Sequence, residues 1–189
     1  MTDTELENGF MLSLKNAQRL IEEADGLAIF ERFSRAYTLY QLGIEEIGKC
    51  LIIYNALLDY YNGESIDAPY LKKHGFFEHK DKTQESLKLE LLVIDFFEKH
   101  IGRETGFKQK IIDDFNNVNQ INNNKNNSLY VSIKDNTFCF PDNVITIEMV
   151  NEIALLAKIR LEAIKPFQRP LTEIETIARG VKELIDKQE

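Results

Sequence analysis

Three charged residues interrupt the most apolar stretch of this sequence. Glu45, Glu46 and Lys49 lie in the middle of residues 28–61, where apolar residues otherwise recur at helical spacing. Glu45 and Lys49 are four residues apart with the acid first, the order that favours an ion pair along one helix. Burying charged groups is costly unless they are paired, so their presence in a core helix needs a reason. The spacing predicts a structural ion pair between Glu45 and Lys49, with a catalytic pair as the alternative.

A second candidate segment, residues 72–82, is the most basic part of an acidic chain. It holds four lysines and two of the three histidines. Histidine changes its charge near neutral pH and is the commonest general acid or base in enzymes. His79 is therefore the candidate reactive group, although it is equally consistent with a solvated helix start. His74 and His100 are interpreted as surface residues.

Several kinds of chemistry can be set aside from the sequence. A di-iron bundle requires Glu-x-x-His on two helices, but leucine or phenylalanine stands three residues before each histidine. Cys50 and Cys139 lack the spacing of zinc ligands, and we expect them to be two buried free thiols. Phosphate-binding glycine loops and nucleophile elbows are also missing from the sequence. We therefore expect no metal and no cofactor.

The elements that must position these residues are predicted to be helices. Residues 28–61 read as one continuous central helix, roughly 50 Å long at 1.5 Å per residue. Asp25-Gly26 is the predicted end of the helix before it, and the asparagine-rich residues 116–127 are a predicted loop. The predicted elements are helices at 4–25, 28–61, 76–100, 107 to about 122, 147–164 and 172–187, with a β-hairpin at about 129–140. Residues 66–74 are a predicted loop with room for one helical turn opened by Asp67 and Pro69.

These elements predict an all-α antiparallel helical bundle that forms a single domain over residues 1–189. A long central helix organises it, a small β-hairpin is inserted, and a C-terminal helical extension covers about 170–188. The formal net charge of −8 argues against a protein that coats nucleic acid, but not against an enzyme with a local basic site. No apolar run approaches the ~20 residues needed to span a bilayer, and the first residues lack a signal-peptide pattern. We expect a cytoplasmic protein with no membrane association.

Three segments, taken in order, resemble the AbiV family of abortive-infection proteins, a branch of the HEPN superfamily. They are EEIGK at 45–49, FEHKDK at 77–82 and KNNSLYV at 125–131. The resemblance covers about residues 8 to 165. It implies a HEPN-like bundle and a bacterial phage-defence protein that stops phage multiplication at the expense of the infected cell.

HEPN proteins are often metal-independent endoribonucleases that work as dimers with paired active sites. The resemblance therefore implies a homodimer that acts on RNA and blocks translation. The aromatic-rich helices also carry more apolar surface than one small bundle easily covers, which favours a two-fold dimer. The usual HEPN signature is an arginine, four to six residues, then a histidine. Here lysines stand in its place, Lys73 with five and Lys72 with six residues before His79.

Under this resemblance His79 is the expected acid or base in RNA cleavage without metal. Glu46 is expected to orient His79 or a lysine, and Tyr130 to donate a hydrogen bond or stack on a base. Lysines would supply the positive charge around phosphate. The expected catalytic lysines are Lys80 and Lys125, and the expected substrate-binding lysines are Lys49, Lys73 and Lys82.

Two further interpretations stay open. The first is a non-enzymatic binding module that senses or sequesters a phage or host protein, in which Glu46, His79 and Lys125 only rigidify the bundle. A phage-encoded protein is a candidate activator under either reading. The second is a structural helical protein with no role in defence.

Overall fold

The computed structural model of this chain describes residues 1–168 and residue 173. The predicted helix at 172–187 and the C-terminal extension at about 170–188 therefore lie outside the described residues.

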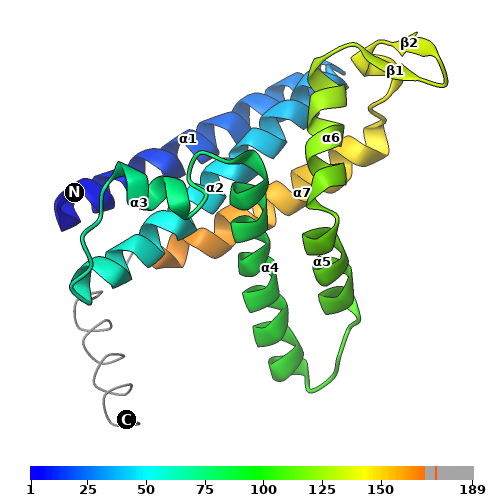
Figure 1. Cartoon of the computed structure of the whole chain (residues 1–189). Coiled ribbons are helices and arrows are strands. Elements are labelled where there is room, and N and C mark those ends of the chain that lie inside the picture. Colours follow the sequence, from blue (N-terminus) through cyan, green and yellow to red (C-terminus); the bar gives the residue numbers. More distant parts are fainter. Residues whose placement is uncertain (169–172, 174–189) are drawn as a thin grey trace.

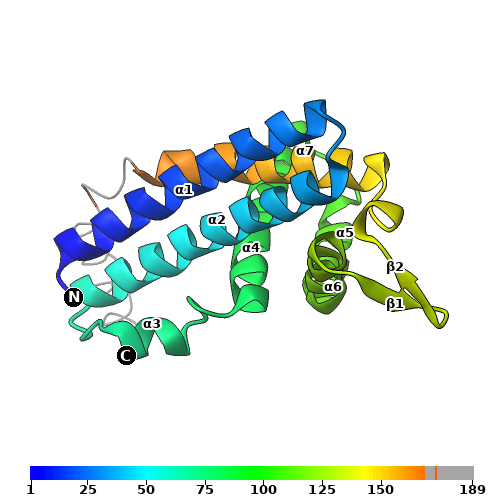
Figure 2. The same ribbon diagram turned by 90° about the horizontal axis from the view of Figure 1, so that it is seen from above.

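Two long antiparallel helices, α1 (Asp3–Ile29) and α2 (Phe33–Tyr61), form the body of the protein. A third helix, α7 (Ile147–Ile164), lies beside them and runs in the same direction as α2 (Figures 1 and 2). A 3-10 segment, Lys165–Gln168, follows α7. The result confirms the predicted all-α fold built around a long central helix.

A second set of helices crosses this layer at a steep angle. It consists of α4 (His79–Ile101) and the consecutive helices α5 (Phe107–Asn116) and α6 (Val118–Leu129). The far half of α4 and the first part of α5 project away from the body as an arm (Figure 1). The short helix α3 (Ala68–Lys73) lies in the connection between α2 and α4, where the sequence predicted a loop with room for one helical turn. The amino end of α4 is thereby brought against the middle of α2.

Local signals explain most of the helix ends. Thr2 and Glu5 form a reciprocal capping box at the start of α1. Asp67 caps α3 through the backbone N–H of Tyr70, 2.7 Å away. Gly102 ends α4 in the left-handed conformation, with φ of 68°, as a glycine beyond a helix commonly does.

The predicted end of the first helix at Asp25-Gly26 is wrong. The helix α1 continues to Ile29, and Glu31, with φ of 56°, makes the turn instead. Glycine permits a helix end but does not impose one, and within a helix it costs only about 1 kcal/mol relative to alanine. Asp25 is held on the helix by Tyr40 Oη, 2.5 Å away, and by Lys158 Nζ at 2.7 Å.

The asparagine-rich loop predicted at 116–127 is also wrong, because α6 occupies most of it. Asn117 only breaks the predicted fourth helix into α5 and α6. Asparagine has a low helix propensity, but propensity yields to tertiary packing. Val118, Lys125 and Ser128 are buried on one face of α6, and that burial holds the segment helical.

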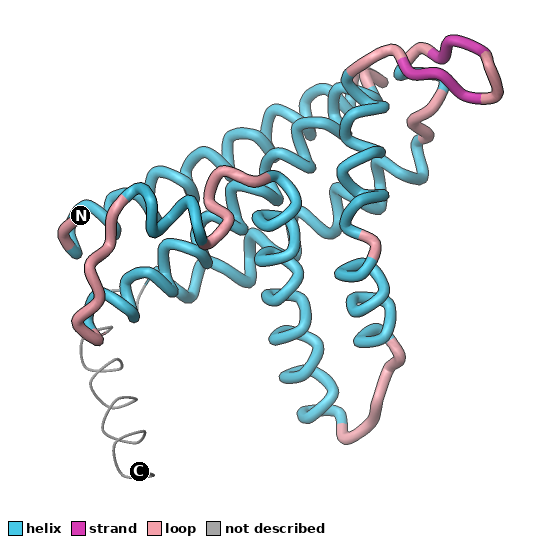
Figure 3. Tube along the Cα trace, in the orientation of Figure 1, coloured by secondary structure: helices cyan, strands magenta, loops and turns pink. Residues whose placement is uncertain are grey.

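The predicted hairpin is confirmed with shorter strands. Strand β1 (Ser132–Lys134) pairs with β2 (Thr137–Cys139), with Ile133 opposite Phe138 (Figure 3). Asp135 and Asn136 have φ of 51° and 60°, the left-handed pair that a type I′ turn needs. A 3-10 turn, Pro141–Asn143, then leads towards α7.

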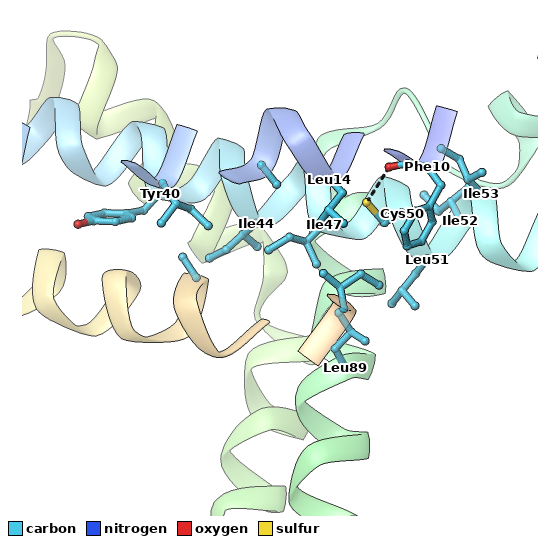
Figure 4. Close-up of a cluster of buried hydrophobic side chains, with 14 of the residues drawn as sticks. Phe10, Leu14, Tyr40, Ile44, Ile47, Cys50, Leu51, Ile52, Ile53 and Leu89 are labelled. Atoms are coloured by element: carbon cyan, nitrogen blue, oxygen red, sulfur yellow. Dashed lines mark hydrogen bonds between the residues drawn. The ribbon is translucent and has the colours of Figure 1, made fainter. Parts of the chain in front are cut away.

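The core lies along α2 and is closed from below by α4. Ile44, Ile47 and Leu57 of α2 are almost fully buried. Leu89 of α4 belongs to the same core cluster as Ile44 and Ile47 (Figure 4). Cys50 is a buried free thiol that donates to the carbonyl of Phe10 at 3.7 Å. Cys139 is also free but only partly buried, because the hairpin lies outside the core. The expectation of two buried thiols thus holds for Cys50 alone.

Candidate functional site

One face of α2 is polar where the helix meets its crossing partners. This polar stripe consists of residues spaced alternately four and three apart: Ser34, Thr38, Gln41, Glu45 and Gly48. Its four polar side chains are at most 5% exposed. Buried polar groups must be hydrogen-bonded, so the stripe fixes which partners α2 can accept.

Each side chain of the stripe finds a partner on another element. Thr38 Oγ1 lies 2.7 Å from Ser128 Oγ on α6, and Gln41 Nε2 donates to Thr83 Oγ1 on α4 at 3.1 Å. Ser34 donates to Asp142, beyond the hairpin. These bonds set the register of α4 and α6 against α2.

Glu45 is the charged residue of the stripe, and its carboxylate contacts three cationic or ionisable side chains. Its carboxylate accepts from Lys125 Nζ at 2.8 Å and lies 2.5 Å from His79 Nδ1. Lys82 Nζ is 3.5 Å away. The three partners come from α4 and α6, so Glu45 ties together segments that are far apart in the chain. We call these four residues the Glu45 cluster.

His79 is the member of the Glu45 cluster that reaches solvent. Its side chain is 56% exposed, whereas that of Glu45 is 3% exposed. An ionised carboxylate only accepts hydrogen bonds, so contact with Glu45 favours the proton on Nδ1. In the neutral imidazole the Nε2 atom is then a free acceptor. A buried acid that orients an exposed histidine is an arrangement that suits a general base.

The two buried lysines make the cluster more positive than one carboxylate can neutralise. The side chains of Lys82 and Lys125 are 7% and 8% exposed. Burial lowers the pKa of the Lys82 ammonium, and the neighbouring Glu45 carboxylate opposes that effect. Both ammonium groups are turned inward, so neither can bind phosphate as the sequence predicts. They act instead as counterions for Glu45.

Of the two partners predicted for Glu46, a histidine or a lysine, the structure shows the lysine. The Glu46 carboxylate pairs with Lys49 Nζ at 2.6 Å, and Lys49 also lies 5.3 Å from the centre of the Phe76 ring. The predicted Glu45–Lys49 pair is therefore replaced by a Glu46–Lys49 pair three residues apart. The reason is geometric, because Glu45 faces α4 and α6 whereas Glu46 lies on a more exposed side of α2.

The other predicted residues lie outside the cluster. Lys73 and Lys80 are exposed in the α3–α4 region, and Tyr130 is 63% exposed just after α6. In the described part of the chain, none of the three makes a hydrogen bond or ion pair with Glu45 or His79. The fold thus brings His79, Lys82 and Lys125 together and leaves Lys73 and Tyr130 apart.

A second buried charged cluster lies further along α4. Arg160 of α7 donates through Nε to Glu90 Oε1 at 2.5 Å and through Nη1 to Ser86 Oγ at 2.9 Å. All three residues are buried. The Arg160–Glu90 ion pair links α7 to α4. It was not predicted from the sequence.

The sequence did contain a signal for the polar stripe. The apolar period of α2 runs through 37, 40, 44, 47, 51 and 54, and the positions one residue later include 38, 41, 45 and 48. Those positions are occupied by Thr, Gln, Glu and Gly, which form a parallel polar stripe. That second register selects Glu45 over Glu46.

The helical bundle is that of an all-α, HEPN-like protein. The family model for AbiV in the HEPN superfamily matches residues 5–162, which is most of the chain. The chain belongs to the AbiV family, and this membership associates it with abortive-infection phage defence. No match was found among curated proteins or among solved structures.

Two further observations concern the described residues alone. They contain no group of three or more His, Cys, Asp or Glu side chains arranged to hold a metal ion. None of their helices combines the length and apolar character needed to cross a membrane.

Proposed function

We propose that this protein acts in abortive infection as a metal-independent endoribonuclease with His79 as its general base. The observation that carries the proposal is the 2.5 Å contact between buried Glu45 and His79 Nδ1. It fixes the ring and leaves Nε2 on the exposed side. The proposal places the protein in the cytoplasm, where its RNA substrate would be found.

The proposed reaction is an internal transesterification of RNA. Nε2 of His79 takes the proton of a ribose 2′-hydroxyl, and the 2′-oxygen forms a bond to the adjacent phosphorus. The bond from phosphorus to the 5′-oxygen of the next nucleotide breaks, and that oxygen takes a proton from water. The imidazolium of His79 gives its proton to the hydroxide that remains, which regenerates the base. The products carry a 2′,3′-cyclic phosphate and a 5′-hydroxyl.

Positive charge near His79 would stabilise the phosphorane. Lys80 is exposed beside it, and Lys82 and Lys125 contribute a buried positive field that one carboxylate does not cancel. His79 is also the first residue of α4, and the first N–H groups of a helix favour anions. Glu78, the residue before α4, makes no side-chain capping bond that would compete for them.

The experiment compares His79→Ala with His74→Ala. Both histidines are exposed in the same basic segment, but His74 bonds to the carbonyl of Tyr70 and not to Glu45. We expect His79→Ala to lose phage suppression and RNA cleavage, with cyclic phosphate ends absent, while His74→Ala keeps both. Unchanged phage suppression by His79→Ala at equal protein level would refute the assignment.

A second candidate function is a binding module that sequesters a phage or host protein. The observation in its favour is the burial of Lys82 and Lys125, which makes the cluster resemble an internal ion-pair network. Intact RNA in infected cells, together with arrested translation and an active His79→Ala variant, would select this function. A phage protein that activates this protein, or is captured by it, would then be recovered with both His79→Ala and His74→Ala.

The proposed protein is a homodimer, and the exposed apolar residues of the arm formed by α4 and α5 support this. Phe96 and Phe107 are 75% and 58% exposed, and Leu92 and Phe97 on α4 are exposed as well. Exposed apolar patches of this kind mark interaction sites. We expect a dimeric mass in solution that Phe96→Glu reduces to a monomer. The matched control is Phe30→Glu, because Phe30 is 76% exposed at the end of α1, away from the arm.

A further inference from the structure

A pocket lies where α2, α5, α6 and α7 meet. Its volume is about 220 Å³, below the roughly 300–1,000 Å³ of sites for drug-sized ligands. That size suits one heterocyclic ring system. The pocket contributes no residue to the Glu45 cluster and is not explained by it.

The walls of the pocket combine apolar faces with amide and hydroxyl groups. Ile44, Ile121 and Ile153 supply apolar surface from three different helices. Gln120 and Asn124 add amides, of which Gln120 Nε2 donates to Asn124 Oδ1 at 2.9 Å. Flat apolar faces with a few polar groups at the edge suit a planar ligand with hydrogen-bonding edges.

Asp114 gives the pocket its unpaired charge. Its partly buried carboxylate makes no hydrogen bond or ion pair in the described part of the chain. The nearby Lys110 is paired with Glu152 at 2.8 Å, and Arg160 already donates hydrogen bonds to Glu90 and Ser86. The pocket therefore presents a free acceptor and excess negative charge, which disfavours phosphate and favours a group with hydrogen-bond donors.

The pocket is adjacent to the Glu45 cluster on two helices. Gln41 lines the pocket one helical turn before Glu45, and Asn124 lines it next to Lys125. Gln41 also reaches α4 through Thr83, whose hydroxyl donates to the carbonyl of His79 at 3.0 Å. A base held in the pocket would thus lie beside the segment of α4 that carries the reactive histidine.

We infer that this pocket binds a single unpaired nucleobase, and that guanine is the base whose edge it fits. Guanine carries two adjacent N–H donors that a carboxylate such as Asp114 accepts together. Its O6 and N7 acceptors can use the amide donors. Unpaired bases in RNA are recognised in this way, through hydrogen bonds on their edges and contact with their faces.

A role for this pocket in cleavage specificity rests on the proposed function, because the bound base would belong to the nucleotide beside the cleaved bond. Binding of the base itself does not depend on cleavage. The two ideas can therefore fail separately.

The first test is calorimetric or NMR titration of the full chain with the four ribonucleoside 5′-monophosphates. The phosphate is common to all four, so differences report the base. We expect 5′-GMP to bind about tenfold more tightly than 5′-AMP, the discrimination of one good bidentate contact. Equal affinities for the four, or tighter binding of N-acetyl-arginine amide than of 5′-GMP, would overturn the inference.

The second test uses Asp114→Asn with Asp113→Asn as its control. Asp113 is the exposed neighbour on α5 and bonds to Gln109 instead of lining the pocket. We expect Asp114→Asn to weaken 5′-GMP binding about tenfold, because a charge-assisted contact is lost, and Asp113→Asn to leave it unchanged. Equal effects of the two would overturn the inference.

His79→Ala separates this inference from the proposed function. It should retain 5′-GMP binding while losing cleavage. If 5′-GMP binds but no variant or wild-type protein cleaves RNA, the pocket assignment stands and the ribonuclease proposal fails. If RNA is cleaved with no base preference that Asp114→Asn alters, the ribonuclease proposal stands and the pocket assignment fails.

Discussion

Gly48 on α2 lies directly against the backbone carbonyl of Lys82 on α4. A Cβ atom built at Gly48 would come within 1.9 Å of that oxygen. No side-chain rotation could relieve this contact, because the obstructing atoms belong to the backbone. The close approach is what allows Glu45, one turn earlier on the same stripe, to reach both His79 and Lys82. It also gives a physical reason for the glycine of the EEIGK segment.

Gly48→Ala should therefore push α4 away from α2. We expect a loss of about 1–3 kcal/mol in the free energy of unfolding, the usual cost of overpacking, together with loss of activity. Urea unfolding and phage plating measure the two effects. Gly26→Ala is the control, because a Cβ atom added at Gly26 would meet nothing within 4 Å and alanine is the better helix former. Equal stability of the two variants would contradict the close contact.

Glu45→Gln should destabilise the protein strongly. The change keeps the shape of the side chain but leaves two buried ammonium groups without a counterion, and breaking a buried pair costs about 3–5 kcal/mol. Glu46→Gln removes a more exposed pair with Lys49 and should cost at most about 1 kcal/mol. Chemical denaturation of both variants checks the difference. A larger loss of unfolding free energy for Glu46→Gln than for Glu45→Gln would contradict the central position of Glu45 among the buried charges.

Asp114→Asn should raise stability at neutral pH. Burial raises the pKa of Asp114 above its ordinary value of 3.8, so the folded state holds its proton more tightly than the unfolded state. Stability from this group is present below its ordinary pKa and is lost as pH rises through the folded-state pKa.

At pH 7 the partly buried, charged carboxylate of Asp114 therefore lowers the free energy of unfolding of the wild-type protein, and the neutral amide of the variant does not. Thermal midpoints should favour Asp114→Asn at pH 7, and the advantage should shrink towards pH 4. An advantage that grows as the pH falls would contradict the assigned direction. Asp113→Asn again serves as the exposed control.

The two cysteines should differ in reactivity. Burial raises the pKa of the Cys50 thiol, so almost no thiolate forms at neutral pH, whereas Cys139 is partly exposed on the hairpin. A thiol reagent should label one cysteine in the native protein and two after unfolding, as counted by mass spectrometry. Cys139→Ser should abolish native labelling. Rapid native labelling of Cys50 would indicate that the α1–α2 core opens readily.

The sequence by itself determined the fold class, because the apolar period of α2 is long and uninterrupted by proline. It also determined the hairpin, because Asp135 and Asn136 suit a turn that needs positive φ at two positions. Short-range patterns of this kind depend on neighbours within a few residues. The family followed from three ordered segments, and the match over residues 5–162 confirms it.

The polar stripe marks Glu45 in the sequence, but only the tertiary structure decided which side chains each glutamate contacts. Glu45 and Glu46 are adjacent in sequence, but a helix turns by about 100° per residue, so one faces α4 and α6 and the other does not. Packing likewise turned the asparagine tract into α6 and carried α1 beyond Gly26, because burial against neighbouring helices outweighs weak local propensities. The contacts of Glu45 with Lys125 and of Gly48 with Lys82 span 80 and 34 positions of sequence, and no local pattern could encode them.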